Sequence, residues 1–197
     1  MTYREIYEAG KGALAAAGIE EADLDARLLL EFVCDTDRNT LLVHGERTVS
    51  EEEEKRYREL LEKRGKRIPL QHLTGVQNFM GLDFSVNAHV LIPRQDTEIL
   101  VEEALKNLHD GMRILDLCTG SGCIAWTMAL SIPESRVTGV DISETALAVA
   151  SGQDFQQELK TKGASRPDFV RADVLDSEQD FDHGMFDLVL SNPPYIM

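Results

Sequence analysis

The chain is poor in cysteine and has no long apolar run. Three cysteines among 197 residues argue against a framework of paired disulfides and for a reducing compartment. The longest apolar stretches, such as Leu28–Leu30 and Ile114–Leu115, are a few residues long, whereas a membrane helix needs about 20. The N-terminal segment also lacks the apolar core of a signal peptide. We therefore expect a cytoplasmic protein without a membrane partner.

Positive charge is scarce as well. Lys and Arg number 20 against 35 Asp and Glu, which gives a formal net charge of −15. Residues 1–74 carry twelve basic and sixteen acidic side chains, and residues 75–197 carry eight and nineteen. Broad binding to DNA or RNA depends on neutralising phosphates, so this charge argues against nucleic acid as a direct partner. The hydrophobic content of 43% excludes wholesale disorder.

Residues 1–74 are predicted to form a small all-α domain. Apolar side chains recur at helical spacing in three stretches, Tyr3–Ala17, Leu24–Val33 and Asn39–His44. Ser50 and Glu53 have the spacing of a capping box and predict the start of a fourth helix with an acidic first turn and a basic last turn. The charged surface of that helix is typical of a solvated face, and a docking surface for a protein partner is the alternative.

Residues 75–93 are predicted to form a β-hairpin linker, and residues 94–197 an α/β domain. A helix is expected to begin at Asp96 or Thr97. Beyond it the pattern predicts strands at 113–117, 136–140, 168–171 and 186–190, with helices at 121–130 and from Ser143 to about Leu159. Strands separated by helices predict a parallel sheet with helices on both faces.

A glycine turn, Cys118–Gly122, follows the first strand of this domain. Gly120 and Gly122 allow a ligand to approach backbone N–H groups at a helix start. The pattern is neither G-x-G-x-x-G nor a P-loop, so it favours a nucleoside ligand with few phosphates. Asp141 ends the second strand about 20 residues later, where an acidic side chain can accept hydrogen bonds from ribose hydroxyls. Capping the next helix is the alternative role of Asp141.

Asp173 follows the third strand. Its carboxylate could accept a hydrogen bond from an adenine amino group, with the backbone of Val174 beside it. An ordinary loop aspartate is an equally good interpretation.

The sequence Asn192-Pro193-Pro194-Tyr195 follows the last predicted strand. Two prolines force the chain out of the sheet at the carboxyl edge, where open α/β sheets bind ligands. The Asn192 side-chain oxygen and the Pro193 carbonyl can both accept hydrogen bonds from one NH2 group, and the Tyr195 ring can lie against that planar group. Such positioning aims the nitrogen lone pair at an electrophile without a strong base. A simple turn is the alternative.

In combination, these segments resemble a class I (Rossmann-like) S-adenosylmethionine-dependent methyltransferase. Asn-Pro-Pro-Tyr occurs in members that methylate planar amide or amino nitrogens. The segments Pro69–Gly75 and Leu91–Glu98, Phe79 and the helical N-terminal domain resemble the HemK/PrmC release factor glutamine methyltransferases. The resemblance implies methyl transfer from S-adenosyl-L-methionine to the glutamine side-chain amide in the Gly-Gly-Gln loop of a peptide-chain release factor, with S-adenosyl-L-homocysteine as product. It also implies that the helical domain recognises the substrate.

The resemblance assigns site residues too. The implied cofactor contacts come from Cys118, Thr119, Gly120, Ser121, Gly122, Asp141, Asp173, Val174 and Asn192. The implied substrate contacts come from Asn192, Pro193, Pro194 and Tyr195, of which Asn192, Pro193 and Tyr195 form the catalytic set. No metal is expected, because Cys118 and Cys123 lack further ligands at a suitable spacing.

The sequence departs from the family pattern at several points. Cys118 stands where glycine is common, and Gly152 weakens the helix after Asp141. The sequence stops soon after Tyr195, whereas family members continue with strands that complete a seven-stranded sheet. We therefore expect the C-terminal strands to be absent, and the strand at 186–190 to be an exposed edge or to be paired in a dimer or a crystal contact. Two alternatives stay open, an adenine-N6 methyltransferase acting on DNA or RNA, and a fragment that only binds S-adenosylmethionine.

Overall fold

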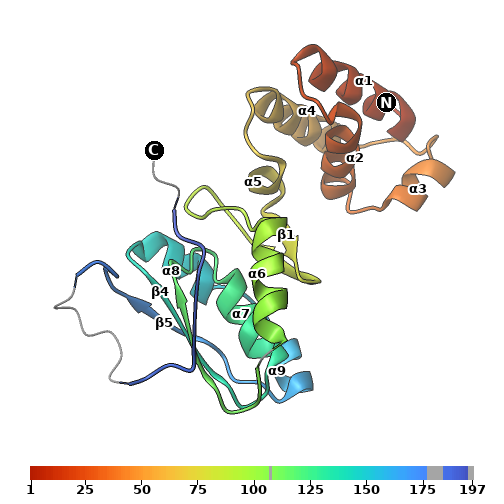
Figure 1. Cartoon of the computed structure of the whole chain (residues 1–197). Helices are drawn as coiled ribbons and strands as arrows, with labels where there is room; N and C mark the ends of the chain where they lie inside the picture. The colour runs from red at the N-terminus through yellow and green to blue at the C-terminus, as the bar shows by residue number, and fades with distance from the viewer. Residues whose placement is uncertain (107, 177–183, 195–197) are drawn as a thin grey trace. The chain divides into compact units, whose positions relative to one another are not determined.

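The computed structural model describes residues 1–106, 108–176 and 184–194 of the chain. The chain divides into two compact units, Met1–Gly75 and Val76–Met197 (Figure 1). Each unit buries its own set of apolar side chains.

The first unit is entirely helical. It consists of α1 (Tyr3–Ala16), α2 (Ala22–Val33), α3 (Arg38–Val43), α4 (Glu51–Gly65) and α5 (Leu70–Thr74). The helices α1, α2 and α4 pack on one another around Leu29, Leu30 and Tyr57, all fully buried. The Tyr57 hydroxyl donates a hydrogen bond to the Ala26 carbonyl at 3.0 Å, so the one polar atom of this core side chain is satisfied.

Capping residues set where these helices begin. The Ser50 hydroxyl accepts a hydrogen bond from the Glu53 N–H at 3.2 Å, and the Glu53 carboxylate accepts one from the Ser50 N–H at 2.8 Å. This confirms the predicted capping box of α4. Thr2 and Glu5 form a second capping box at the start of α1. The short helix α5 was not expected; it fits between Pro69, its N-cap, and Gly75, whose left-handed φ of 78° ends it.

The second unit begins with a hairpin and a helix. The strands β1 (Val76–Phe79) and β2 (Leu82–Ser85) pair antiparallel, and α6 (Gln95–Leu105) follows. Phe79 and Phe84 are buried and pack edge to face at 6.1 Å between ring centroids. The Glu98 carboxylate accepts a hydrogen bond from the Met80 N–H at 2.7 Å, which fastens the hairpin turn to α6.

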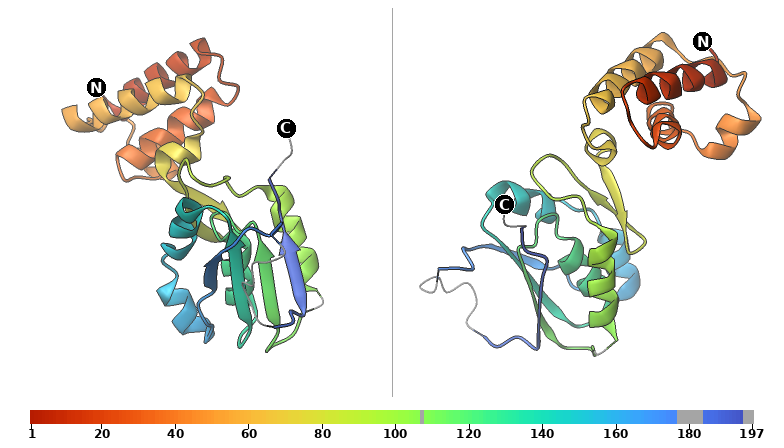
Figure 2. Two further views of the ribbon diagram at one scale, coloured as in Figure 1. Left: turned by 90° about the vertical axis from the view of Figure 1, so that its left-hand side faces the viewer. Right: turned by 45° about the horizontal axis from the view of Figure 1, so that its top comes forward.

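A parallel four-stranded sheet forms the centre of this unit. Its strands are β3 (Arg113–Leu117), β4 (Arg136–Asp141), β5 (Asp168–Arg171) and β6 (Leu188–Ser191), in the order β5-β4-β3-β6 (Figure 2). The parallel sheet confirms the predicted α/β class, and within the described chain β6 is an edge strand. Strand order places the first two strands at the centre and the third and fourth on opposite sides of them.

Helices pack on one face of the sheet. The main core joins α6 and α7 (Cys123–Ser131) to Ile114, Val137 and Leu190 of the strands. The other face carries a smaller cluster of Leu115, Val140 and Ala172, to which the described helices contribute no residue. The expectation of helices on both faces is therefore wrong for the described chain, in which the second face stays partly open, with Val189 of β6 52% exposed.

The expected helix from Ser143 to about Leu159 is interrupted. The structure has α8 (Glu144–Ser151) and α9 (Gln156–Lys162), separated by four residues. In the interruption, Gln153 and Phe155 are buried, and the Phe155 ring packs between Phe84 and Trp126 at 5.0 and 5.2 Å. A continuous helix could not direct both side chains inward in this way, so tertiary packing overrides the local helical pattern.

Candidate functional site

Strand register brings the predicted site segments to one edge of the sheet. Leu117 of β3 lies opposite Val140 of β4 and Ser191 of β6. The glycine turn, Asp141 and Asn192 therefore lie at the ends of neighbouring strands, at the same carboxyl edge of the sheet. Asp141 in turn lies opposite Arg171 of β5, which places Asp173 beyond the next strand end.

The glycine turn is held in a left-handed conformation at three residues. The φ angles are 60° at Cys118, 55° at Gly120 and 80° at Gly122. A side chain at Gly122 would lie 3.0 Å from the Ala150 Cβ, so that position is closed by packing. A side chain at Gly120 would meet no atom nearer than the Cys118 carbonyl at 4.0 Å, so open space lies beside Gly120. The turn thus presents backbone at Gly120 and packs against the protein at Gly122.

Asp116, in the strand directly before the turn, holds the turn through hydrogen bonds. The Asp116 carboxylate is fully buried and accepts hydrogen bonds from the Thr119 hydroxyl at 2.5 Å and the Ala125 N–H at 3.2 Å. Its other oxygen has no hydrogen-bond partner within the described residues. Desolvation raises the pKa of Asp116 to about 7. The sequence pattern contains Asp116 but predicted no role for it; its place directly before the turn was the available signal.

Thr119 and Ser121 are almost entirely buried, at 4% and 2% exposure. The Thr119 hydroxyl is committed to Asp116, and the Thr119 N–H donates to the Val140 carbonyl at 2.9 Å. Because both side chains are buried, they shape the turn. Thr119 and Ser121 would therefore contact a ligand through their backbone atoms. The partly buried Cys118 thiol has a raised pKa, chiefly through desolvation.

Asp141 joins the turn to the second strand. One carboxylate oxygen accepts a hydrogen bond from the Gly120 N–H at 2.9 Å, and the other accepts one from the Ser143 N–H at 2.9 Å. The side chain that caps α8 is Ser143, whose hydroxyl accepts from the Ala146 N–H at 3.2 Å. Each carboxylate oxygen of Asp141 keeps a second lone pair that can accept from a hydroxyl group. Its predicted contact with ribose is compatible with this geometry and stays a prediction.

Asn192 is tied to α6. The Asn192 side-chain N–H donates a hydrogen bond to the Thr97 hydroxyl at 2.9 Å, and Thr97 is 5% exposed. Thr97 lies in the segment that resembles the family, but its partner could not be read from a spacing of 95 residues. Pro193 and Pro194 follow as exposed residues. Tyr195 lies outside the described residues.

Asp173 and Val174 lie beyond β5. The Asp173 carboxylate accepts a hydrogen bond from the Leu175 N–H at 3.0 Å, a local bond typical of a loop aspartate. Val174 is 39% exposed, and Ile142, directly after Asp141, is 59% exposed. Sequence reasoning did not single out Ile142, although an apolar residue next to an acidic strand end was the available signal. Exposed apolar side chains at this edge offer contact area for a planar ring.

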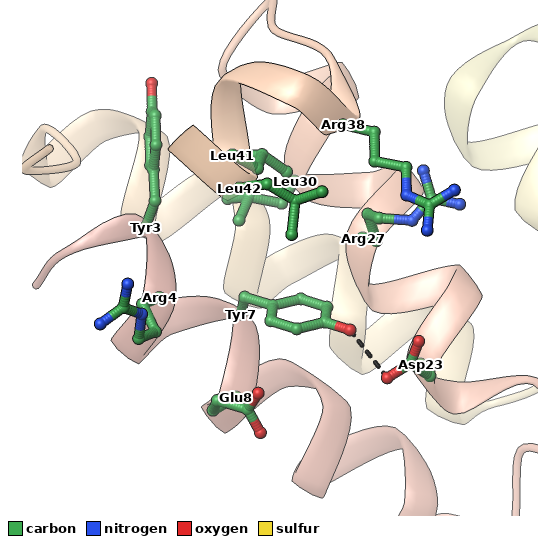
Figure 3. Close-up of a pocket in the computed structure, with 10 residues that line it drawn as sticks. All are labelled: Tyr3, Arg4, Tyr7, Glu8, Asp23, Arg27, Leu30, Arg38, Leu41 and Leu42. Carbon is green, nitrogen blue, oxygen red and sulfur yellow. Dashed lines mark hydrogen bonds between the residues drawn. The ribbon is translucent and has the colours of Figure 1, made fainter. Parts of the chain in front are cut away.

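A separate hollow lies in the helical unit and contains none of these residues. It has a volume of about 330 Å3 and lies among α1, α2 and α3 (Figure 3). The Tyr7 hydroxyl donates to Asp23 across its floor at 2.7 Å, with Leu30, Leu41 and Leu42 on the opposite side. It is thus a feature of the first unit alone.

Two further observations concern the described residues as a whole. None of the helices in residues 1–106, 108–176 and 184–194 is long and apolar enough to cross a membrane. In the same ranges, no group of three or more His, Cys, Asp or Glu side chains is placed to hold a metal ion.

A parallel sheet with a glycine turn after its first strand, an acidic residue at the end of its second and Asn-Pro-Pro after its fourth defines a class I methyltransferase. Residues 108–195 match the family model of a methyltransferase domain, and residues 5–75 match the PrmC N-terminal domain.

Relatives narrow the class to a family. A release factor glutamine methyltransferase of Koribacter versatilis is 37% identical over 198 residues, covering 100% of this chain and 68% of the relative. The protein of that name from Geobacter sulfurreducens is 40% identical over 195 residues, covering 99% of this chain and 66% of the relative. The chain belongs to the release factor glutamine methyltransferase family, as its sequence predicted, and spans about two thirds of the length of these relatives.

A solved structure also aligns with part of the chain. A tRNA (uracil-54, C5)-methyltransferase of Pyrococcus abyssi, in complex with S-adenosyl-L-homocysteine, is 21% identical and covers 60% of this chain and 28% of that chain, at a TM-score of 0.43.

Proposed function

We propose that this chain binds S-adenosylmethionine at the carboxyl edge of its sheet and serves the N5-methylation of a glutamine side chain in peptide-chain release factors. The register between β3 and β6 carries the proposal, because it brings Asn192 beside the glycine turn. The printed names of the relatives support release factors as the substrate.

The cofactor fits the residues at this edge. Open space beside Gly120 leaves room for the methionyl part, and Asp141 retains acceptor capacity for ribose hydroxyls. Asp173, Val174 and the exposed Ile142 would receive the adenine. S-adenosylmethionine supplies a methyl group made electrophilic by a positively charged sulfur. The acidic residues near the turn suit that charge.

The substrate amide would be held by acceptors alone. The Asn192 side-chain oxygen and the Pro193 carbonyl would accept hydrogen bonds from the two N–H groups of the glutamine amide, and the Tyr195 ring would lie against the plane of that amide. In the proposed transfer, the amide nitrogen would gain the methyl group and would give one proton to water, and S-adenosylhomocysteine would be the other product. Orientation supplies most of the acceleration, since no strong base belongs to the proposed set.

The two units would divide the work. Residues 1–74 would recognise the release factor, residues 75–93 would link the domains, and residues 94–197 would bind cofactor and the glutamine. The net charge of −15 supports a protein substrate over the adenine-N6 alternative.

Transfer of a labelled methyl group tests this function. The chain is incubated with methyl-labelled S-adenosylmethionine and, separately, a release factor, its Gly-Gly-Gln→Gly-Gly-Ala variant, or DNA. We expect label in the release factor and none in its variant. Label in DNA would establish the nucleic-acid alternative, and cofactor binding without transfer would establish the binding-only alternative.

Asn192→Ala tests the proposed catalytic group. The substitution removes an acceptor for the substrate amide, so methyl transfer should fall by at least about a hundredfold while the cofactor is still bound. Calorimetric titration with S-adenosylhomocysteine measures binding, and label counting measures transfer. A variant that transfers methyl groups at the original rate would remove Asn192 from the mechanism.

A further inference from the structure

Within the described residues, the side chain of Asn192 makes a hydrogen bond to α6, at a residue that lies 95 positions earlier in the chain. Asn192 donates its amide N–H to the Thr97 hydroxyl at 2.9 Å. Thr97 sits in the first turn of α6 and is 5% exposed, so water competes little for this bond. The contact joins the end of β6 to α6 within the second unit.

In the arrangement that the structure shows, the NH2 end of the Asn192 amide is bonded to Thr97 and the oxygen is the other end. A side-chain amide has an acceptor oxygen at one end and a donor NH2 at the other. With the NH2 engaged by Thr97, the oxygen is the end that can accept a hydrogen bond. A flipped amide would present its NH2 to the NH2 of a glutamine substrate, and two donors cannot bond to each other. The orientation with the NH2 on Thr97 is therefore the one that suits a hydrogen-bond donor at the substrate position.

The Thr97 hydroxyl is itself firmly placed. The Thr97 N–H donates to the Arg94 carbonyl at 3.0 Å in the first turn of the helix. The next residue, Glu98, accepts a hydrogen bond from the Met80 N–H at 2.7 Å and so ties the same turn to the hairpin. The helix packs its buried Val101 into the main core of the unit. A hydroxyl on such a support changes position little when a ligand binds.

We propose that Thr97 is a positioning residue that fixes the Asn192 amide with its oxygen available to the substrate. This inference rests on the proposed function for the identity of the substrate, but the contact itself belongs to the free protein. Thr97 does not touch the reacting atoms; it acts through Asn192.

Two substitutions of Thr97 separate positioning from packing. Thr97→Val keeps the shape and removes the hydroxyl, whereas Thr97→Ser keeps the hydroxyl and removes a methyl group. Thr127→Val is the matched control, because Thr127 is also a buried helical threonine, at 3% exposure, and its hydroxyl lacks a partner in the described chain. All three proteins are assayed for methyl transfer to a release factor and for cofactor binding.

The expected pattern is a loss in kcat alone. Thr97→Val should lower kcat about ten- to hundredfold, leaving the KM and the binding constant for S-adenosylmethionine unchanged. Thr97→Ser should restore most of the rate, and Thr127→Val should match the original chain. A Thr97→Val protein with full kcat, or one that loses cofactor binding in step with rate, would overturn the proposal.

A measurement without substrate keeps this proposal distinct from the proposed function. In 15N-labelled protein, the side-chain NH2 protons of Asn192, assigned with Asn192→Asp, should exchange with water more slowly than those of the exposed Asn39. Thr97→Val should abolish the difference, and Thr127→Val should retain it. Absence of methyl transfer by the original chain would refute the proposed function, whereas equal exchange rates for Asn192 in all proteins would refute the role of Thr97.

Discussion

Asp116 shows how one residue can make stability depend on pH. Its folded pKa of about 7 lies well above the value near 4 of an unfolded aspartate. Between these values the folded state holds a proton that the unfolded state has released. The free energy of unfolding should therefore fall as pH rises from about 4 to about 7, by an amount on the order of a few kcal/mol, and change little above that range through this group.

The slope can be measured by urea unfolding at several pH values, followed by the fluorescence of Trp126, the single tryptophan, which is buried in α7. Asp116→Asn keeps an acceptor oxygen for Thr119 and Ala125 but does not ionise, so it should flatten the slope. Asp154→Asn, at an exposed carboxylate, is the control and should leave the slope intact. An unchanged slope in Asp116→Asn would contradict this assignment.

Gly122 has a left-handed backbone and also lacks space for a side chain. The losses of stability that these two features cause on substitution can be measured separately. Gly111 has nearly the same φ, 81° against 80°, but no atom lies within 4 Å of a side chain placed there. Both Gly→Ala substitutions should cost about 1–2 kcal/mol for the backbone. Gly122→Ala should cost at least about 1 kcal/mol more, because its Cβ would lie 3.0 Å from both Ala150 and Trp126. Equal losses in urea unfolding would show that the surroundings of Gly122 yield freely.

At the scale of elements, Gln153 explains why α8 and α9 are separate. Its side-chain oxygen accepts from the Ser85 N–H at 2.9 Å, and its NH2 donates to the carbonyls of Ser85 and Ser121 at 2.9 and 3.2 Å. One buried side chain thus joins the hairpin, the glycine turn and the interruption between the helices. The Gln153 amide makes the two hydrogen bonds to the Ser85 backbone that a residue of a neighbouring strand would make.

Removal of the Gln153 side chain should therefore lower the free energy of unfolding by more than the loss of its packing alone would. Gln153→Ala leaves three backbone groups without partners and should reduce stability by about 1–3 kcal/mol in urea. Gln153→Glu should also destabilise, since a carboxylate would face two carbonyl oxygens. Gln157→Ala, in the exposed surface of α9, provides the comparison and should be close to neutral. If both alanine variants unfold at the same urea concentration, the bridge contributes nothing.

The elements that the sequence predicts well are those with local causes. Ser50 and Glu53 lie three residues apart and cap α4 as their spacing indicates, and the strand, turn and helix around Gly120 follow from neighbouring residues. The residues that sequence reasoning missed have partners far along the chain. Thr97 meets Asn192 across 95 positions, and Gln153 meets Ser85 across 68. A hydrophobic or turn pattern carries no information about such pairs, because the fold alone brings them together.

At the scale of the whole molecule, the charge is unevenly divided between the two units. The larger excess of acidic residues lies in residues 75–197, which also carry the proposed site. The sequence identifies the family through its Asn-Pro-Pro-Tyr motif, the segments Pro69–Gly75 and Leu91–Glu98 and the helical unit, and the relatives confirm the family. The individual contacts with cofactor and substrate remain predictions, because they depend on molecules that are not part of the chain.

The strand order also has a consequence for the time at which the site is completed. The last strand, β6, lies beside β3, so Ser191 contacts Leu117 across 74 positions of the chain. During synthesis the glycine turn, Asp141 and the strands β3, β4 and β5 are all made before Asn192 exists. A growing chain therefore acquires most of the residues proposed for the cofactor first, and Asn192, which is proposed for the glutamine as well, last. Folding would prepare the methyl donor's place before any substrate could be captured.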